Sequence, residues 1–178
     1  MPFNLPIFLT WLRVATIPLV VGIFYLPESW LDVHEKNLWA TIFFVGAAIT
    51  DWLDGYLARK HGITRSGAFL DPLADKILVL GAMFTLVSRD VFWVVPVLII
   101  AAREIGVSLY RVFVGSKGVS MPASKTAKVK TVSQQLAVGF ALAPFAVVDQ
   151  TWTFTIFMWI AVALTLLSAA QYAVKAVR

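Results

Sequence analysis

Four aspartates at the ends of two long apolar segments constrain this chain more than any other feature of its sequence. Asp51 and Asp54 lie three residues apart near the end of one apolar segment, and Asp71 and Asp75 lie four residues apart at the start of the next. Both spacings put the paired carboxylates on one face of a helix. The link between the segments, residues 60–66, is short, so we expect two antiparallel neighbouring helices with all four carboxylates close together.

Carboxylates in an apolar environment are costly unless a positive charge compensates them. Helix capping is an alternative interpretation for Asp71 alone, because Asp71 precedes Pro72 as a residue at a helix start does. Capping does not explain Asp51 and Asp54, because the helix dipole disfavours negative charge near a helix C-terminus. One or two divalent cations are the simplest partners, and Mg²⁺ or Mn²⁺ prefers oxygen ligands of this kind. The four aspartates therefore predict a metal site.

The composition of the chain is that of a membrane protein. Of 178 residues, 60% are hydrophobic and only 14% are charged, which excludes an ordinary soluble domain. The chain has no cysteine, so thiolate metal sites and disulfides are excluded, and its two histidines do not show the spacing of a zinc site. The net charge of +5 lies in the links between apolar segments, which argues against a nucleic-acid surface. We expect one integral membrane domain over residues 1–178.

Six apolar segments are long enough to span a membrane, which needs about 20 helical residues. They cover residues 5–26, 38–58, 68–88, 91–114, 131–148 and 152–174. Lysines and arginines gather in alternate links and at the C-terminal end, as is typical of cytoplasmic segments. The sequence therefore predicts an all-α integral membrane protein with six transmembrane helices and both termini in the cytoplasm. Both aspartate pairs then lie in the inner leaflet near the lipid headgroups.

The aspartates belong to a longer pattern, D-x2-D-G-x2-A-R-x7-G-x3-D-x3-D, which residues 51–75 match at every position. Its glycines and alanine leave room for a ligand to approach the backbone, and its arginine suits phosphate oxygens. The pattern resembles the signature of the CDP-alcohol phosphatidyltransferases, membrane enzymes with six transmembrane helices. Members of that family move a phosphatidyl or similar group from a CDP-linked donor to an alcohol and release CMP.

The resemblance implies a role for each position of the pattern. Asp51, Asp54 and Asp71 would hold two Mg²⁺ or Mn²⁺ ions, and Asp75 would be both a metal ligand and the base that takes the acceptor's hydroxyl proton. The residues that would line the CDP site are Gly55, Ala58, Arg59 and Gly67. The resemblance also implies a homodimer in the bacterial inner membrane, with the active site facing the cytoplasm.

Segments outside the pattern indicate CDP-diacylglycerol as the donor and glycerol 3-phosphate as the acceptor. The start N-L-P-I-F-L-T-W-L-R, the A-R-E-I of the fourth apolar segment and the K-T-A-K-V-K-T before the fifth resemble the family members that use this acceptor. Basic side chains on inner-facing helix positions need an anionic partner, which a phosphorylated acceptor supplies. The candidate residues for the acceptor phosphate are Thr10, Arg13, Arg103, Arg111, Lys125 and Lys128.

Each acceptor candidate also has a structural interpretation. Arg103 can pair with Glu104 or with another helix, and the two lysines can face the lipids of the inner leaflet. Thr10 and Arg13 can serve helix packing or interfacial anchoring instead of closing the pocket.

Two other functions are open from the sequence. Other members of the family make cardiolipin, phosphatidylinositol phosphate or phosphatidylserine, and assays with different acceptors separate these products. An ion or proton transporter also uses intramembrane carboxylates, but it needs a path across the membrane. In this chain the acids gather at one membrane face, and the outer halves of the predicted helices carry no charge, which argues against such a path.

Overall fold

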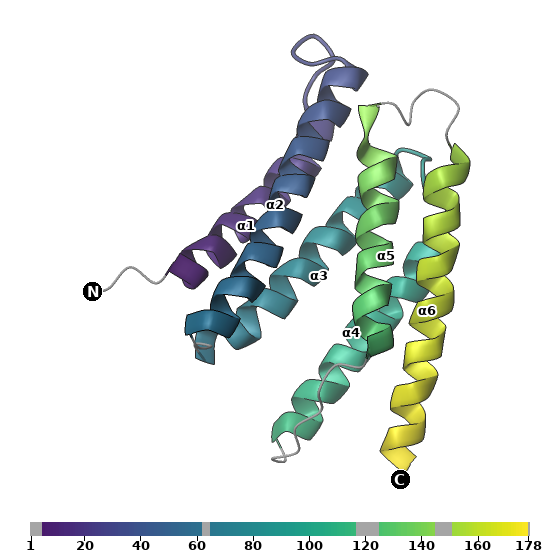
Figure 1. The fold of residues 1–178 in the computed structure, drawn as a ribbon. Coiled ribbons are helices and arrows are strands. Elements are labelled where there is room, and N and C mark those ends of the chain that lie inside the picture. The colour runs from purple at the N-terminus through teal and green to yellow at the C-terminus, as the bar shows by residue number, and fades with distance from the viewer. Residues whose placement is uncertain (1–4, 62–64, 117–124, 145–150, 178) are drawn as a thin grey trace.

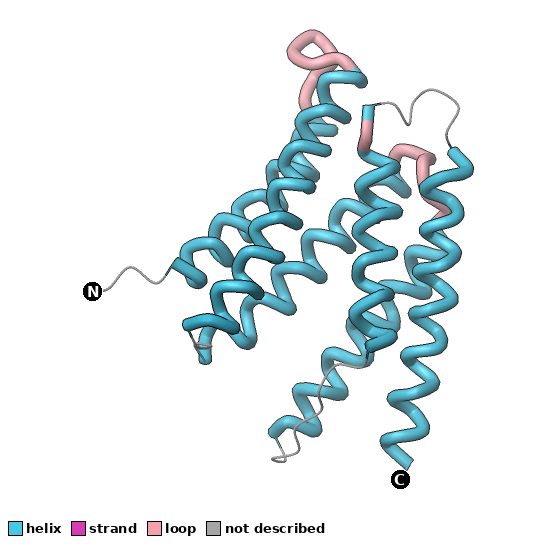
Figure 2. Tube along the Cα trace, in the orientation of Figure 1, coloured by secondary structure: helices cyan, strands magenta, loops and turns pink. Residues whose placement is uncertain are grey.

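The chain forms a helical bundle (Figures 1 and 2). The computed structural model describes the backbone of residues 5–61, 65–116, 125–144 and 151–177, and the side chains of 11–51, 53, 75–110, 113–114, 128–144 and 152–171. Its elements are α1 (Leu5–Gly22), the short 3₁₀ helix η1 (Ile23–Tyr25), α2 (Val33–His61), α3 (Arg65–Ser88), α4 (Val94–Ser116), α5 (Lys125–Leu142) and α6 (Thr151–Val177). All regular structure in these ranges is helical, so the all-α prediction is confirmed.

The helices pack as two groups, α1 to α3 and α4 to α6. Helices α3 and α5 make the contacts between the two groups. Helix α1 lies along both α2 and α3, whereas α2 and α3 touch each other only sparingly. Helix α5 packs along α6, α4 packs against α6 and α3, and α5 also reaches α2 and α3 (Figure 1). The sequence predicts that the short link makes α2 and α3 direct neighbours; in the structure α1 provides most of the packing between them.

Successive helices run in opposite directions, which sets the two ends of the bundle. Helices α2 and α4 end, and α3 and α5 begin, at the end of the bundle where α1 begins and α6 ends (Figure 1). The C-terminal part of α2 and the N-terminal part of α3, which carry the aspartate pattern, therefore lie at one end of the bundle.

Helix α2 begins earlier than the predicted apolar segment 38–58, and a capping box explains why. The side chain of Asp32 accepts a hydrogen bond from the backbone N–H of Glu35 at 2.7 Å, and the Glu35 carboxylate accepts one from the N–H of Asp32 at 2.9 Å. This reciprocal pair satisfies two N–H groups at the helix start. Hydropathy locates the apolar part of a helix, whereas the caps decide where the helix begins.

The boundaries of α5 also correct the prediction of an apolar segment at 131–148. The helix starts at Lys125, within the segment that the sequence predicts to be a basic link, and it ends at Leu142. Lysine and alanine are good helix formers, so the basic stretch adds turns to the helix although it is not apolar. Pro144 stops the helix, because the residue before a proline avoids the helical conformation and proline has no N–H.

The buried core is apolar and draws on every long helix. Its fully buried members include Val20, Phe44, Met83, Ile100, Val138 and Ala161. The outer surface is apolar as well, since Trp93, Leu109 and Trp152 are all more than half exposed. A surface of this kind is suited to contact with lipid.

One helix of the described chain, Trp152–Gln171, is long and apolar enough to cross a membrane by length and composition, and Trp11–Tyr25 is a shorter apolar helix. The predicted spans at 38–58, 68–88 and 91–114 carry charged residues within their apolar runs, and α5 ends at Leu142, inside the predicted span 131–148. The prediction of six transmembrane spans with cytoplasmic termini thus stays a prediction.

Candidate metal and substrate site

A buried arginine joins two of the predicted metal ligands. Nη1 of Arg13, on α1, lies 3.1 Å from Oδ1 of Asp51 on α2 and 3.0 Å from Oδ1 of Asp75 on α3. The Arg13 side chain is fully buried, whereas those of Asp51 and Asp75 are 36% and 22% exposed. The guanidinium therefore lies inside the bundle, and the two carboxylates that it contacts reach the surface.

The geometry of Asp51 and Asp75 fits a divalent cation site. Because distances of 3.1 and 3.0 Å join their Oδ1 atoms to one nitrogen, these two oxygens cannot be more than about 6 Å apart. Carboxylate oxygens are the ligands that Mg²⁺ and Mn²⁺ prefer, and partial exposure leaves the ions a route of entry. Two carboxylates on different helices at this spacing suit one ion or a pair of adjacent ions.

Asp51 and Asp75 are the predicted metal ligands whose side chains the structure describes. Among the described side chains, no group of three or more His, Cys, Asp or Glu is arranged to hold a metal ion. The side chains of nine predicted site residues lie outside the described part of the structure: Thr10, Asp54, Gly55, Ala58, Arg59, Gly67, Asp71, Arg111 and Lys125. Their roles stay predictions, and the backbone assigns each of them to α1, α2, α3, α4 or α5.

Arg13 has a different immediate environment from the one that the sequence predicts. The sequence assigns it to the acceptor phosphate, whereas the structure places its guanidinium on two predicted metal ligands. The signal for this pairing was present in the sequence, because Arg13 lies in an apolar helix where a cation needs a nearby anion. Its contribution to acceptor binding stays a prediction.

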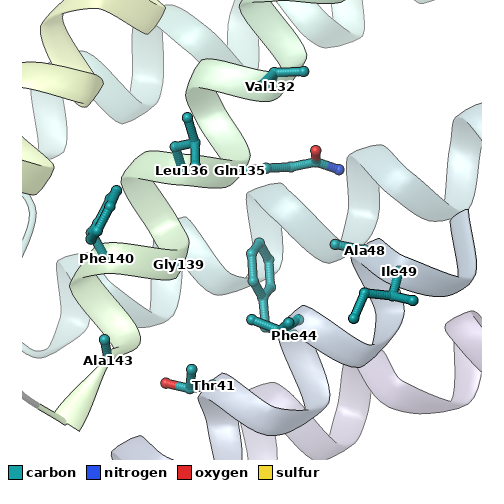
Figure 3. A pocket seen from close by; sticks show the side chains of 11 residues that line it. Thr41, Phe44, Ala48, Ile49, Val132, Gln135, Leu136, Gly139, Phe140 and Ala143 are labelled. Atoms are coloured by element: carbon teal, nitrogen blue, oxygen red, sulfur yellow. The ribbon is translucent and has the colours of Figure 1, made fainter. Parts of the chain in front are cut away.

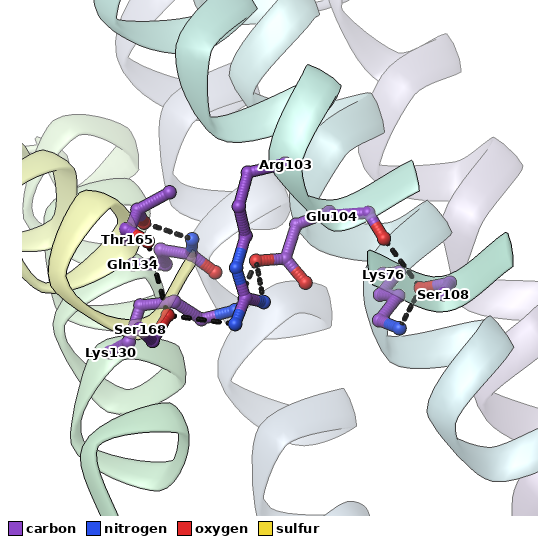
Figure 4. Close-up of polar contacts among 8 residues, drawn as sticks. All are labelled: Lys76, Arg103, Glu104, Ser108, Lys130, Gln134, Thr165 and Ser168. Atoms are coloured by element: carbon purple, nitrogen blue, oxygen red, sulfur yellow. Dashed lines mark hydrogen bonds and ion pairs between the residues drawn. The ribbon is translucent and has the colours of Figure 1, made fainter. Parts of the chain in front are cut away.

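A second polar cluster lies among α4, α5 and α6 (Figure 4). The carboxylate of Glu104 accepts an ion pair from Lys130, and its Oε1 also lies 3.1 Å from Nη1 of Arg103. Nη2 of Arg103 donates a hydrogen bond of 2.7 Å to Oγ of Ser168 on α6. Glu104, Lys130 and Ser168 are buried, so this cluster satisfies charge inside an apolar bundle.

The cluster extends to α3 through Lys76. Nζ of Lys76 donates to Oγ of Ser108 on α4, one turn after Glu104 (Figure 4). Lys76 directly follows Asp75 in the chain, so two adjacent residues of α3 serve the two polar clusters. Within the described cluster, Arg103 and Lys130 pair with the carboxylate of Glu104, and Lys76 contacts Ser108 on the same helix. Among the described side chains, this neighbourhood holds more basic than acidic groups.

The two acceptor candidates that remain, Arg103 and Lys128, have different surroundings in the structure. Arg103 pairs with Glu104, as its structural interpretation predicts. Lys128 is exposed on α5. Sequence reasoning did not assign Lys76, Glu104 or Lys130 to a site. For Lys76 and Glu104 the signal was a charged residue inside an apolar segment, whereas Lys130 lies just before the predicted segment 131–148 and gave no such signal.

Comparison with known proteins identifies a family and relatives of this chain. The family model of the CDP-alcohol phosphatidyltransferases matches residues 3–167. A protein of Haemophilus influenzae is 41% identical over 185 residues, which cover 97% of this chain and 92% of the relative. A Bacillus subtilis protein is 37% identical with 96% and 93% covered, and one of Escherichia coli K12 is 42% identical with 80% and 78% covered. All three relatives are named CDP-diacylglycerol–glycerol-3-phosphate 3-phosphatidyltransferase.

Replacing Arg13 by glutamine should destabilise the protein strongly. The change leaves the carboxylates of Asp51 and Asp75 without their cation, and breaking a buried ion pair costs about 3–5 kcal/mol. We expect a loss of about 3 kcal/mol, because both carboxylates are partly exposed. The free energy of unfolding of the purified protein in detergent measures this loss.

The matched control is Arg89→Gln, which also removes one arginine. Arg89 lies over the Phe24 ring at 4.6 Å, a cation–π contact worth about 0.5–1 kcal/mol where exposed. Combining Arg13→Gln with Asp75→Asn should cost less than the sum of the two single changes. Equal losses for Arg13→Gln and Arg89→Gln, with additive double-variant energies, would contradict a central role for the Arg13 ion pairs.

Proposed function

The chain belongs to the CDP-alcohol phosphatidyltransferase family, and we propose that it transfers the phosphatidyl group of CDP-diacylglycerol to glycerol 3-phosphate. The products are phosphatidylglycerophosphate and CMP. The observation that carries this proposal is the nearly full-length match to relatives that are named for this reaction. The convergence of Asp51 and Asp75 from two helices supports it independently, because a transferase of diphosphate-linked donors needs a site for divalent cations.

The proposed metal ligands are Asp51, Asp54, Asp71 and Asp75, with Mg²⁺ or Mn²⁺ as the ions. When bound, two such ions supply positive charge that stabilises the diphosphate and the departing CMP. The carboxylates of Asp51 and Asp75 come from different helices, so the site depends on how α2 and α3 are held. Arg13 contacts both and thereby keeps the two carboxylates at a fixed spacing.

Asp75 is the proposed base for the acceptor. The hydroxyl oxygen of glycerol 3-phosphate attacks the phosphorus that carries the diacylglycerol, and the bond from that phosphorus to the CMP oxygen breaks. The proton of the hydroxyl passes to the Asp75 carboxylate. Arg13 orients this carboxylate through its Oδ1 atom. A base held in place in this way can assist the attack by about 10²–10⁴-fold.

The remaining site residues are proposed from their places in the pattern and on the helices. Gly55, Ala58, Arg59 and Gly67 line the CDP site, at the same end of the bundle as the metal ligands. The acceptor phosphate binds near the basic residues of α4 and α5. Of these basic residues, Arg103 lies beside Lys76 and Lys130.

We also propose that the protein spans the bacterial inner membrane six times, as a homodimer, with its termini and active site facing the cytoplasm. The apolar surface of the bundle supports a membrane location. The shared end of α1 and α6 supports termini on one side (Figure 1).

The test of this function is an acceptor panel. Purified protein receives CDP-diacylglycerol with glycerol 3-phosphate, phosphatidylglycerol, inositol phosphate or serine, and CMP release and the lipid product are both measured. We expect phosphatidylglycerophosphate from glycerol 3-phosphate alone, and no CMP release in excess EDTA until Mg²⁺ or Mn²⁺ is restored. A different lipid product would reassign the acceptor, and full turnover in EDTA would overturn the metal proposal.

Changing Asp75 to asparagine should separate catalysis from donor binding. The amide keeps the size of the carboxylate and loses its basicity, so we expect CMP release to fall by about 10²–10⁴-fold while CDP-diacylglycerol still binds. Asp51→Asn is the comparison, because the loss of a metal ligand alone should weaken donor binding as well. Donor binding and CMP release are measured on one preparation. If Asp75→Asn loses donor binding as fully as Asp51→Asn, Asp75 is chiefly a metal ligand.

Arg103→Ala should raise the KM for glycerol 3-phosphate by more than that for CDP-diacylglycerol, because the lost cation serves the acceptor phosphate. A bidentate or charge-assisted contact of this kind is worth about 1.5–3 kcal/mol, or roughly 10- to 100-fold in KM. Ser168→Ala is the matched control, since it removes the hydrogen-bond partner of Arg103 on α6 and keeps the cation. Equal KM changes for the two variants, or for the two substrates, would assign Arg103 to packing.

A further inference from the structure

Two cavities of the described structure differ in the charge of their lining. The groove between α2 and α5 is lined by apolar side chains together with Thr41 and Gln135, and its described lining holds no charged group (Figure 3). A second cavity, of about 340 Å³, lies between the α3–α4 link and the first turns of α6, and Asp90 is part of its lining. This volume is within the range of about 300–1,000 Å³ that is typical of small-molecule sites. We call the second cavity the Asp90 pocket.

The Asp90 pocket is far from the candidate metal site. Helix α3 rises for about 20 Å from Asp75 to Ser88, its last residue, and Asp90 follows two residues later. The pocket lies at the end of the bundle where α4 and α6 begin, opposite to the end that carries the aspartate pattern (Figure 1). It is therefore a separate site.

Asp90 carries its charge at a position where a helix disfavours a carboxylate. Its φ is 58°, in the left-handed region where glycine is usual. Its N–H donates to the carbonyl oxygen of Val87 at 3.1 Å, and the N–H of Val91 donates to that of Leu86 at 3.0 Å, so Asp90 ends α3 in a Schellman motif. The C-terminal end of a helix dipole is negative. A cation beside Asp90 would relieve this repulsion.

Among the described side chains, no cation pairs with the Asp90 carboxylate. The adjacent cation, Arg89, lies over the Phe24 ring, with its guanidinium carbon 4.6 Å from the ring centroid. Asp90 is exposed, so a ligand can reach it. The pocket therefore offers a negative charge that the described part of the protein does not neutralise.

Aromatic side chains line much of the rest of the pocket. Phe92 and Phe154 are almost fully buried and pack together with their ring centroids 5.7 Å apart, so they form its floor. Trp93 and Trp159 are 76% and 49% exposed and lie at its rim. Aromatic rings attract cations over their faces, and cages of such rings recognise organic ammonium groups. Exposed tryptophans alone are ordinary interfacial anchors, but a carboxylate beside them adds a partner for a cation.

We propose that the Asp90 pocket binds the ammonium headgroup of a membrane phospholipid, of the kind that phosphatidylethanolamine carries. Asp90 supplies the opposite charge, and the aromatic side chains enclose the ammonium group. Apolar surface continues along α4 beside the pocket, where Val94, Val95 and Leu98 are about half exposed, and the acyl chains of the lipid cover it. A soluble amine would leave this surface uncovered, so the lipid is the better fit. The proposal uses the membrane location proposed above and does not depend on the reaction.

The first experiment measures lipid binding to the full-length protein in detergent by native mass spectrometry. The probes are phosphatidylethanolamine and N-acetylated phosphatidylethanolamine with the same acyl chains, because acetylation removes the ammonium charge. We expect the Kd of phosphatidylethanolamine to be lower by about 10-fold or more, the usual scale of one charge-assisted contact. Soluble ethanolamine at the same concentration should compete weakly. Equal Kd values for the two lipids would overturn the proposal, and full competition by ethanolamine would overturn the assignment to a lipid.

Asp90→Asn is the variant that tests the charge, because asparagine also tolerates the left-handed backbone. We expect it to raise the Kd of phosphatidylethanolamine by about 10-fold and to leave that of the acetylated lipid unchanged. Trp159→Leu should weaken binding in the same direction by a smaller factor. The matched controls are Glu28→Gln, an exposed acid in another link at the same end of the bundle, and Trp152→Leu, an exposed tryptophan of α6 outside the pocket. Equal effects of the pocket variants and their controls would overturn the proposal.

Thermal unfolding separates a ligand site from a purely structural role of Asp90. In detergent without lipid, the Tm of Asp90→Asn should not fall, because the change removes a negative charge from the C-terminal end of a helix. The rise in Tm that phosphatidylethanolamine gives to the unaltered protein should be lost in this variant. A lower Tm without lipid, together with an undiminished rise on adding it, would assign Asp90 to the helix end alone. Neither experiment requires turnover, so a failure of the proposed reaction would leave both results interpretable.

Discussion

The ion pairs of Arg13 are the interaction on which the rest of the structure depends. A fully buried guanidinium is tolerable only with anionic partners, and Asp51 and Asp75 supply them from two different helices. Helix α1 packs along both α2 and α3, which share little contact of their own. The charge of Arg13 and the packing of α1 therefore set the distance between the two halves of the proposed metal site.

The arrangement also links the two polar clusters of the bundle. Asp75 and Lys76 are neighbours on α3, and they point to different partners, Arg13 on α1 and Ser108 on α4. A shift of α3 along its axis would disturb both contacts at once. On the proposed function, the residue that serves the acceptor's hydroxyl and the cations near the acceptor's phosphate are thus carried by one rigid element.

The sequence predicted the helical class, because long apolar segments that span a membrane form helices. Of the four aspartates that it predicts to lie together, the structure describes Asp51 and Asp75, which share a contact with Arg13. It did not predict that Arg13 would lie between Asp51 and Asp75, since partners across helices depend on packing that periodicity does not encode. The starts of α2 and α5 were misplaced for a related reason: Asp32 caps a helix, and Lys125 extends one, without being apolar. The roles of Asp54 and Asp71 stay at the level of the pattern.

The difference in exposure between the two carboxylates indicates how two unlike substrates can reach one site. Asp51 is the more exposed of the pair, whereas Asp75 is less exposed and directly precedes Lys76, which contacts Ser108 on α4. A lipid donor requires an apolar path open to the bilayer, and a phosphorylated alcohol requires a polar one. On the proposed function, the donor and the acceptor meet at the carboxylates that Arg13 joins. On the proposed function, the buried arginine therefore lies beside the carboxylate that serves as the base and positions it through Oδ1.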